Sequence, residues 1–287
     1  MRERHLPLVL VSPAVALLVG LIAYPFLISI FMSLTDKRIG TAGTFVGLAN
    51  YARLLNDDMF QQTVKNTLLY AVSAVSFKTV LGLSLALCLA AVSRGRRFFR
   101  GLVLLPWVVP TSLSVLAWWW MFDPLLSVIN WTLRGFGGQN IPWLSDPFWA
   151  RAAVITVNVW RGTPFFAVAF LSGLVSIPRE YYEAAQTDGA GALRSFWHIT
   201  LPLMRPVLAI VVLYSIVMTV GDFEIVYLLT RGGPFGRTHL FSTYAYQVGL
   251  QGTDIGLGAA AALFIFPVLA VASYLIMRVV RAGEQYA

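Results

Sequence analysis

Two apolar stretches of this chain carry polar side chains at helical spacing. The first stretch contains Asn158, Arg161 and Gly162, and the second contains Thr219 and Asp222. Residues three or four positions apart lie on one face of a helix, so each stretch presents its polar groups together. Such groups are costly when they have no partner in an apolar environment. We therefore expect the two faces to converge on a cavity that holds a small polar solute.

Three other kinds of chemistry are open to the same region. Arg161 and Asp222 could simply pair, or could join Lys78 and Glu224 in a structural network. Asp222 and Glu224, or His198, could act as acid and base in a membrane enzyme, although the sequence shows no nucleophile–base arrangement. Lys78, Arg161 and Asp222 could instead serve a proton-driven secondary transporter.

The sequence offers little to a metal ion or a nucleotide. Its single cysteine, Cys88, and its three scattered histidines predict no metal site. The phosphate-binding pattern Gly-x-x-x-x-Gly-Lys-Ser/Thr does not occur in it. We therefore expect no metal, no cofactor and no catalytic residue in this chain, and any nucleotide that drives the protein should bind to another chain.

The composition is that of a membrane protein. Of the 287 residues, 58% are hydrophobic and only 12% are charged, whereas about a quarter of the residues in a soluble domain are charged. The mean hydropathy is +0.73. The net charge is +8, but the arginines lie at the ends of apolar runs and not on one patch. This placement predicts membrane topology and argues against nucleic-acid binding.

Six apolar runs are long enough to cross a bilayer as helices. The sequence therefore predicts an all-α polytopic membrane protein with six transmembrane helices, at about residues 9–34, 66–92, 101–122, 150–175, 206–230 and 255–280. Lys and Arg are enriched in cytoplasmic loops. Arginines cluster at Arg2–Arg4, at Arg94–Arg100 and at Arg278–Arg281, so we expect both termini in the cytoplasm.

Small residues in two of these runs predict close packing between helices. Gly82, Ala86 and Ala90 follow one another at four-residue spacing in the second run, and Gly256 and Gly258 begin the sixth. Between the first two runs, residues 48–65 alternate apolar and polar side chains. This pattern predicts one amphipathic helix at the membrane interface.

A polar, charged segment at residues 177–205 interrupts the apolar pattern on the cytoplasmic side. Pro178 suits the first turn of a helix, and Gly189 suits a left-handed stop at a helix end. We therefore predict a short helix over about Arg179–Asp188, then a turn. The next apolar helix is expected to start past two prolines, Pro202 and Pro206.

The sequence of this segment resembles the signature loop of the membrane subunits of binding-protein-dependent ABC importers. It reads Glu183-Ala-Ala-x-x-Asp188-Gly189-Ala, followed by Phe196, Ile199, Leu201-Pro202 and Pro206. Asn158-x-Trp160 with Pro164, and Leu229-Thr230-x-Gly232-Gly233-Pro234, are similar to the maltose and glycerol-3-phosphate branch. The resemblance covers nearly the whole chain. It implies an ABC importer permease fold with one transmembrane permease domain, residues 1–287, and a cytoplasmic coupling loop, residues 177–205.

The resemblance also implies which residues hold the solute and which meet the ATPase. Positions that hold sugar in the larger maltose-importer subunit correspond here to Trp107, Thr111, Asn158, Arg161, Gly162, Thr219 and Asp222. Arg161 and Asp222 depart from the maltose pattern because they are charged, which suggests another substrate or a structural pair. The ATPase-coupling residues implied are Glu183, Ala184, Ala185, Asp188 and Gly189.

The partners implied are those of an ATP-driven importer in the inner (cytoplasmic) membrane. This chain would form half of the pathway for a di- or oligosaccharide, in a heterodimer with a second, related permease subunit. Two ATP-binding cassette ATPase subunits would hydrolyse ATP on the inside, so the chain itself would not be an enzyme. An extracytoplasmic solute-binding protein would deliver the sugar. The lipid bilayer is the remaining partner, and no nucleic acid is expected.

Overall fold

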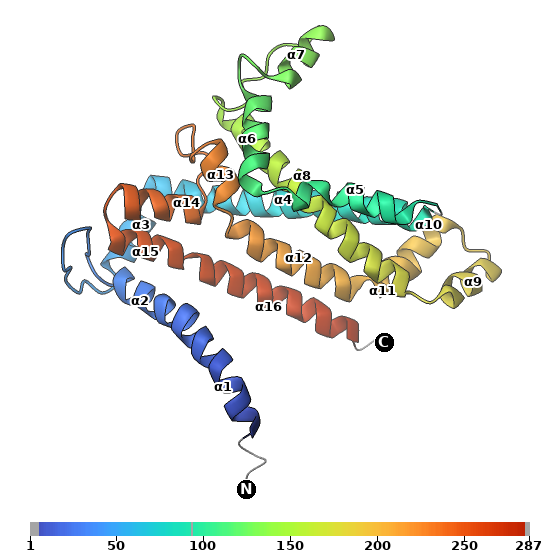
Figure 1. The fold of residues 1–287 in the computed structure, drawn as a ribbon, viewed down its shortest axis with the longest axis horizontal. Helices are drawn as coiled ribbons and strands as arrows, with labels where there is room; N and C mark the ends of the chain where they lie inside the picture. Colours follow the sequence, from blue (N-terminus) through green and yellow to red (C-terminus); the bar gives the residue numbers. More distant parts are fainter. Residues whose placement is uncertain (1–5, 93, 285–287) are drawn as a thin grey trace. The chain divides into compact units, whose positions relative to one another are not determined.

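The computed structural model describes residues 6–92 and 94–284, and α-helices make up most of them (Figure 1). The α-helices are α1 Leu6–Leu18, α2 Tyr24–Ser33, α3 Ala49–Leu55, α4 Asp58–Ala91, α5 Arg96–Val108, α6 Thr111–Phe122, α7 Val128–Gly135, α8 Pro147–Ser176, α9 Arg179–Thr187, α10 Ala192–Ser195, α11 Leu201–Leu203, α12 Arg205–Val220, α13 Glu224–Leu229, α14 Phe241–Tyr246, α15 Ile255–Leu263 and α16 Ile265–Glu284. Three π-helical turns join some of them, at Val19–Ala23, Phe196–Thr200 and Gln247–Gln251. The predicted all-α class is confirmed.

The chain forms two compact units. The first contains the residues up to Gln61 together with Tyr244–Ile265, and the second contains Gln62–Thr243 and the residues from Phe266 onward. In the first unit, α15 packs against α2 and α3. The buried Asn50 side chain of α3 donates hydrogen bonds to the carbonyl oxygens of Ser33 (2.9 Å) and Thr35 (2.7 Å), which fixes the end of α2 against α3.

Close packing in the first unit depends on the glycines of α15, as their spacing predicted. A Cβ atom at Gly256 would lie 2.0 Å from the carbonyl oxygen of Thr35, and one at Gly258 would lie 2.4 Å from the Cα of Gly249. Real Cβ atoms do not approach other atoms so closely. Both positions therefore require glycine so that the backbones can meet.

Residues 48–65 do not form the single amphipathic helix that the sequence predicted. α3 ends at Leu55 and α4 begins at Asp58. The Asp57 side chain between them accepts a hydrogen bond from the Phe60 backbone N–H (2.6 Å), so it caps the first turn of α4. The apolar side chains of this segment, Leu54 and Phe60, are buried. The capping aspartate thus begins a new helix within a segment whose amphipathic pattern is continuous.

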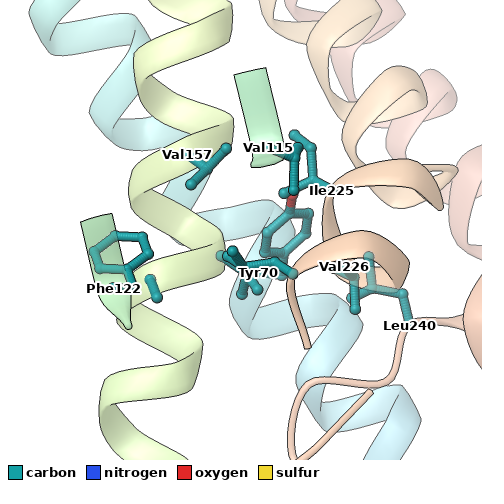
Figure 2. Packing of buried hydrophobic residues seen from close by; sticks show 10 residues of the cluster. Tyr70, Val115, Phe122, Val157, Ile225, Val226 and Leu240 are labelled. Carbon is teal, nitrogen blue, oxygen red and sulfur yellow. The ribbon is translucent and has the colours of Figure 1, made fainter. Parts of the chain in front are cut away.

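The second unit is organised around α8. α5 lies alongside α8, α12 and α13 also contact it, and α13 packs against α6 (Figure 1). A buried cluster joins these helices to α4, and Figure 2 shows Tyr70 of α4, Val157 of α8 and Ile225 of α13 gathered in it. Val226, Leu240, Val115 and Phe122 complete its labelled part.

The small-residue face of α4 is confirmed at two of its three positions. A Cβ atom at Gly82 would lie 2.4 Å from the Cβ of Phe166 on α8, and Ala86 is fully buried. Ala90 is exposed, so the predicted face does not extend to it.

Five helical segments of the described residues are long and apolar enough to cross a membrane, and a sixth results if one bent pair counts as a single span. The bent pair is α5 and α6, which meet at 84°. The predicted third span, 101–122, is thus broken between Val108 and Thr111 at Val109-Pro110, since Pro110 has no backbone N–H to donate.

The predicted fifth span, 206–230, also differs from the structure at both ends. Its helical segment runs from Ala192 to Val220, so it begins before Pro202 and Pro206 and contains both. At its other end α12 stops at Val220, and three residues intervene before α13. Arg2 and Arg4, which supported the cytoplasmic N-terminus, lie outside the described residues.

Candidate functional site

A cavity of about 310 Å³ lies within the second unit. Its walls come from α4, α5, α6, α8, α12 and α13. The lining residues are Lys78, Trp107, Thr111, Asn158, Arg161, Gly162, Phe165, Phe166, Tyr214, Ser215, Met218, Thr219, Asp222, Glu224 and Ile225. All seven residues that the sequence predicted for the solute pathway are among them, together with Lys78 and Glu224. Their role in transport stays a prediction.

Two breaks in the helices bring these residues together. Trp107 lies in the last turn of α5 and Thr111 begins α6, so both flank the 84° bend. Asp222 lies between α12 and α13, where its backbone N–H donates to the carbonyl oxygen of Thr219 (3.2 Å). Irregular backbone at membrane depth is tolerated where it lines a cavity or is buried in protein.

Asp222 is held by neutral donors. Its Oδ2 accepts hydrogen bonds from the Tyr70 hydroxyl (2.6 Å) and from Nδ2 of Asn158 (3.1 Å). The Ser242 hydroxyl donates to its carbonyl oxygen. The structural pair of Arg161 with Asp222, which the sequence left open, is not formed: no carboxylate oxygen of the described residues lies within 4.0 Å of an Arg161 nitrogen.

Lys78 reaches the cavity across the surface of α8. Its ammonium donates to the hydroxyl of Thr219 (2.9 Å), and its side chain is buried. A Cβ atom at Gly162 would lie 2.5 Å from Cδ of Lys78. Gly162 therefore leaves the room through which the lysine side chain passes, and this explains why a glycine at this position matters for the cavity.

Three buried polar atoms of the lining residues have no hydrogen-bond partner within the described part of the chain. They are Oδ1 of Asn158, Nε of Arg161 and Oγ of Ser215. A buried polar atom without a partner costs about 1–3 kcal/mol, so most such atoms in proteins are paired. Toward a bound solute or water, Oδ1 of Asn158 can accept a hydrogen bond, Nε of Arg161 can donate one, and Oγ of Ser215 can do either.

Aromatic rings line another part of the cavity. The rings of Trp107 and Phe165 are nearly parallel, with centroids 6.3 Å apart and an interplanar angle of 28°. Phe165 in turn contacts Tyr214, at a centroid distance of 4.9 Å. Hydroxyl, amide and charged groups beside flat apolar rings suit a ligand that has hydroxyls on its rim and an apolar face.

The sequence alone did not identify Tyr70 or Ser215 as residues of the site. Tyr70 precedes Lys78 by eight residues and Ser215 precedes Thr219 by four, so each shares a helical face with a residue that was singled out. A search of the same two helical faces for further polar side chains could have found both. The sequence could not show that Tyr70 meets Asp222, because the two residues are 152 positions apart.

The cytoplasmic segment forms the short helix that was predicted. α9 runs over Arg179–Thr187, and Asp188 follows as its C-terminal cap. Gly189 has a φ of +76°, and its N–H donates to the carbonyl oxygen of Gln186 (3.0 Å). A residue at positive φ favours glycine, so the helix stop that the sequence indicated is present.

The side chains proposed for ATPase coupling are largely open to solvent in this chain. Glu183, Ala184 and Asp188 are exposed, and Ala185 is half-buried. The helix is anchored from its other side, where the hydroxyls of Tyr182 and Thr200 lie 2.9 Å apart. The helix thus combines a fixed inner face with an exposed outer face.

Comparison with known proteins shows which family this chain is similar to. Residues 78–283 match the family described as binding-protein-dependent transport system inner membrane component. The chain belongs to this family. The matched range includes α8, α9 and every residue that lines the cavity.

Close relatives of this inner membrane component are permease proteins of sugar transport systems. The chain is 36% identical over 266 residues to the trehalose/maltose transport system permease protein MalF of Thermococcus litoralis, covering 92% of this chain and 90% of that protein. It is 32% identical over 284 residues to the sulfoquinovosyl glycerol transport system permease protein SmoG of Agrobacterium fabrum, covering 98% and 92%.

A solved structure shares the fold over nearly the full length of both chains. It is a chain of a bacterial ABC transporter involved in the import of the acidic polysaccharide alginate. The TM-score is 0.81, the sequences are 25% identical, and the match covers 96% of each chain. The ABC importer permease fold that the sequence motifs implied is therefore confirmed, as is the place of the chain among membrane-spanning permeases.

Proposed function

We propose that this chain is one of two permease subunits of an ATP-driven sugar importer, and that the cavity between α4, α8 and α12 forms part of the sugar pathway. Family membership and the sugar-transport relatives support this proposal. The observation that carries it is the convergence of all seven predicted pathway residues on one cavity. Its solute is a di- or oligosaccharide, or a similar glycoside.

The chemistry of the cavity fits such a solute. Oδ1 of Asn158 and Oγ of Ser215 are buried and free to bind sugar hydroxyls. The rings of Trp107 and Phe165 can lie against the apolar face of a pyranose. The names of the two sugar-transport relatives point to trehalose or maltose in one case and to sulfoquinovosyl glycerol in the other, and all of these ligands carry ring hydroxyls.

The partners follow from the family and from α9. A binding protein outside the membrane delivers the sugar, and a second, related permease completes the pathway. Two ATPase subunits bind on the cytoplasmic side, where the exposed face of α9 with Glu183 docks in a groove of one of them. ATP is hydrolysed by those subunits, so this chain is not an enzyme and holds no cofactor. Both termini lie in the cytoplasm.

The alternatives are less well supported. A membrane enzyme would need Asp222 free for acid–base chemistry, but Tyr70 and Asn158 both donate to its carboxylate. His198 does not line the cavity; its ring lies 3.0 Å from the carbonyl oxygen of Arg194. A proton-driven secondary transporter would use Lys78, Arg161 and Asp222, and only a measurement of the energy source separates it from an importer.

The test is reconstitution of this chain with its second permease, its ATPase and its binding protein in proteoliposomes. We expect trehalose, maltose or sulfoquinovosyl glycerol to be taken up only when ATP is on the cytoplasmic side and the binding protein is on the other. Uptake that follows a proton gradient without ATP would support the secondary transporter. Conversion of the sugar into a product by this chain alone would support the enzyme.

A further inference from the structure

The charges around the cavity are arranged unevenly. Four charged side chains of the described residues line it, and the two carboxylates, Asp222 and Glu224, come from one short segment after α12. The two cations come from elsewhere, Lys78 from α4 and Arg161 from α8. The two sugar-transport relatives are named for different sugars, so they leave the charge of this chain's solute open. Which of these four charged groups pair with one another therefore decides whether the cavity suits a charged or a neutral solute.

The cations keep unused hydrogen-bond donors. The Lys78 ammonium has three donors and uses one of them, toward Thr219 at 2.9 Å. The Arg161 guanidinium has five donors, and none of them meets an acceptor within the described residues, its buried Nε included. Asp222, in contrast, is already satisfied by Tyr70 and Asn158. Among the described residues no carboxylate forms a salt bridge with Lys78 or Arg161, so both cations keep donors for a ligand.

We propose that the sugar this cavity receives carries an acidic substituent, a carboxylate or a sulfonate, and that Lys78 and Arg161 bind it. This inference rests on the proposed function and adds the chemical class of the substrate. A guanidinium binds planar or tetrahedral oxyanions through two parallel hydrogen bonds, and such charge-assisted bonds are stronger than neutral ones. Glu224 also lines the cavity, where its carboxylate can accept hydrogen bonds from sugar hydroxyls.

The geometry of Gly162 supports a binding role for Lys78. A merely structural lysine would gain by a direct ion pair, but no carboxylate oxygen of the described residues lies within 4.0 Å of the Lys78 ammonium, although the charge of Asp222 is near enough to interact with it. Lys78 instead crosses Gly162, whose missing Cβ leaves the space, and ends at a neutral hydroxyl beside the cavity. The ammonium is thus placed where its remaining donors can meet a ligand oxyanion.

The experiment uses three glycosides that differ only at C6 of the sugar ring. Glucosyl glycerol carries a hydroxyl there, glucuronosyl glycerol a carboxylate, and sulfoquinovosyl glycerol a sulfonate. In the reconstituted complex we expect kcat/KM for ATP-dependent uptake of at least one acidic glycoside to exceed that of the neutral one by about tenfold, the factor that one charge-assisted contact supplies. All variants share one binding protein, so differences between them report on this chain.

Substitutions then assign the effect to the two cations. Lys78→Met and Arg161→Met should each lower the ratio of kcat/KM for the acidic glycoside to kcat/KM for the neutral glycoside about tenfold, while Arg161→Lys should retain part of the acidic preference. Gly162→Ala should act like Lys78→Met, because it displaces the lysine side chain. Lys65→Met, an exposed lysine of the same helix, is the matched control and should change neither uptake.

The outcomes separate this inference from the proposed function. If the wild-type complex takes up glucosyl glycerol or trehalose as well as the acidic glycosides, or if the methionine variants lower all uptake equally with the complex intact, the acidic-substrate proposal is wrong and the importer stands. If the assembled complex takes up none of the four sugars with ATP and binding protein present, the proposed function itself is contradicted.

Discussion

At the scale of single residues, the carboxylate of Asp222 is the centre of the site's hydrogen bonding. Tyr70 is buried and its hydroxyl lies 2.6 Å from Oδ2. Removal of one hydrogen bond to a charged group costs about 1.5–3 kcal/mol. Tyr70→Phe keeps the ring and its packing, so we expect it to lower the melting temperature of the purified complex by the loss of this bond alone. A thermal melt followed by fluorescence measures it.

Tyr24→Phe is the control for this prediction. Tyr24 is 63% exposed, so loss of its hydroxyl should leave the melting temperature unchanged. Equal melting temperatures of Tyr70→Phe and the wild type would show that the hydroxyl does not stabilise Asp222.

Removal of the carboxylate in Asp222→Asn should lower the melting temperature less than Tyr70→Phe does, because a neutral amide oxygen still accepts a hydrogen bond and needs less solvation than a carboxylate.

Residue types and spacing predicted much of the site. Asn158, Arg161 and Gly162 share a helical face, and polar groups in apolar runs have to meet partners or a cavity. The spacing could not predict which partners they meet. Lys78 reaches Thr219 although 141 positions separate them, and Arg161 keeps its donors free although a carboxylate lines the same cavity. Such pairings depend on how the helices pack, which no local pattern encodes.

At the scale of elements, α9 and the turn after it should transmit ATP hydrolysis to the membrane helices. Gly189 has a φ of +76° and an added Cβ would meet no atom within 4 Å, so a side chain there strains only the backbone. Gly189→Val should cost roughly 1–3 kcal/mol of local strain and misdirect the helix. We expect ATP-dependent uptake to fall while the permease still inserts in the membrane.

Gly191→Val is the matched control, because Gly191 has a φ of −73° and also has open space around its Cα. It should transport like the wild type. The docking role of α9 would be wrong if Gly189→Val, in a complex purified in normal amount, took up sugar at the wild-type rate. Loss of uptake in both variants would instead point to the loop surface and not to the turn.

The contact between α4 and α8 makes a second prediction at this scale. A Cβ at Gly82 would lie 2.4 Å from the Cβ of Phe166 and 3.3 Å from the backbone nitrogen of Ala167, which cannot move aside cheaply. Gly82→Val should overpack the contact, at a cost of about 1–3 kcal/mol, and lower the melting temperature. Ala90→Val, on the exposed end of the same helix, should not. A Gly82→Val complex as heat-stable as the wild type would contradict the close approach.

Element boundaries were the least predictable part of the fold. Apolar runs show where a helix crosses a membrane, but they do not show the 84° bend at Val109-Pro110 or the end of α12 at Val220. Proline also misled in the opposite direction: Pro202 and Pro206 lie inside a helical segment that begins at Ala192. Within that segment each proline stands near the start of a helix, Pro202 in α11 and Pro206 in α12. Proline fits these early positions because it lacks only a donor, so its effect depends on where the helix starts.

At the scale of the whole molecule, the arginine bias predicts that the loop with α7 is outside the cell and the loop with α9 is inside. With the single cysteine removed by Cys88→Ser, Phe136→Cys and Gly191→Cys each introduce one thiol at an exposed position. In intact cells a membrane-impermeant maleimide should label the first and not the second, and both after lysis. Labelling of Gly191→Cys alone in intact cells would reverse the topology.

The central claim is that the cavity between α4, α8 and α12 forms part of the sugar pathway, and uptake by two cavity variants tests it most directly. Asn158→Ala removes the unpartnered Oδ1, and Thr219→Ala removes the hydroxyl that holds Lys78. At limiting sugar we expect each variant to assemble in normal amount and to lower ATP-dependent uptake about tenfold, which corresponds to one lost hydrogen bond of about 1.4 kcal/mol. Wild-type uptake in both variants would remove these residues from the pathway and contradict the account.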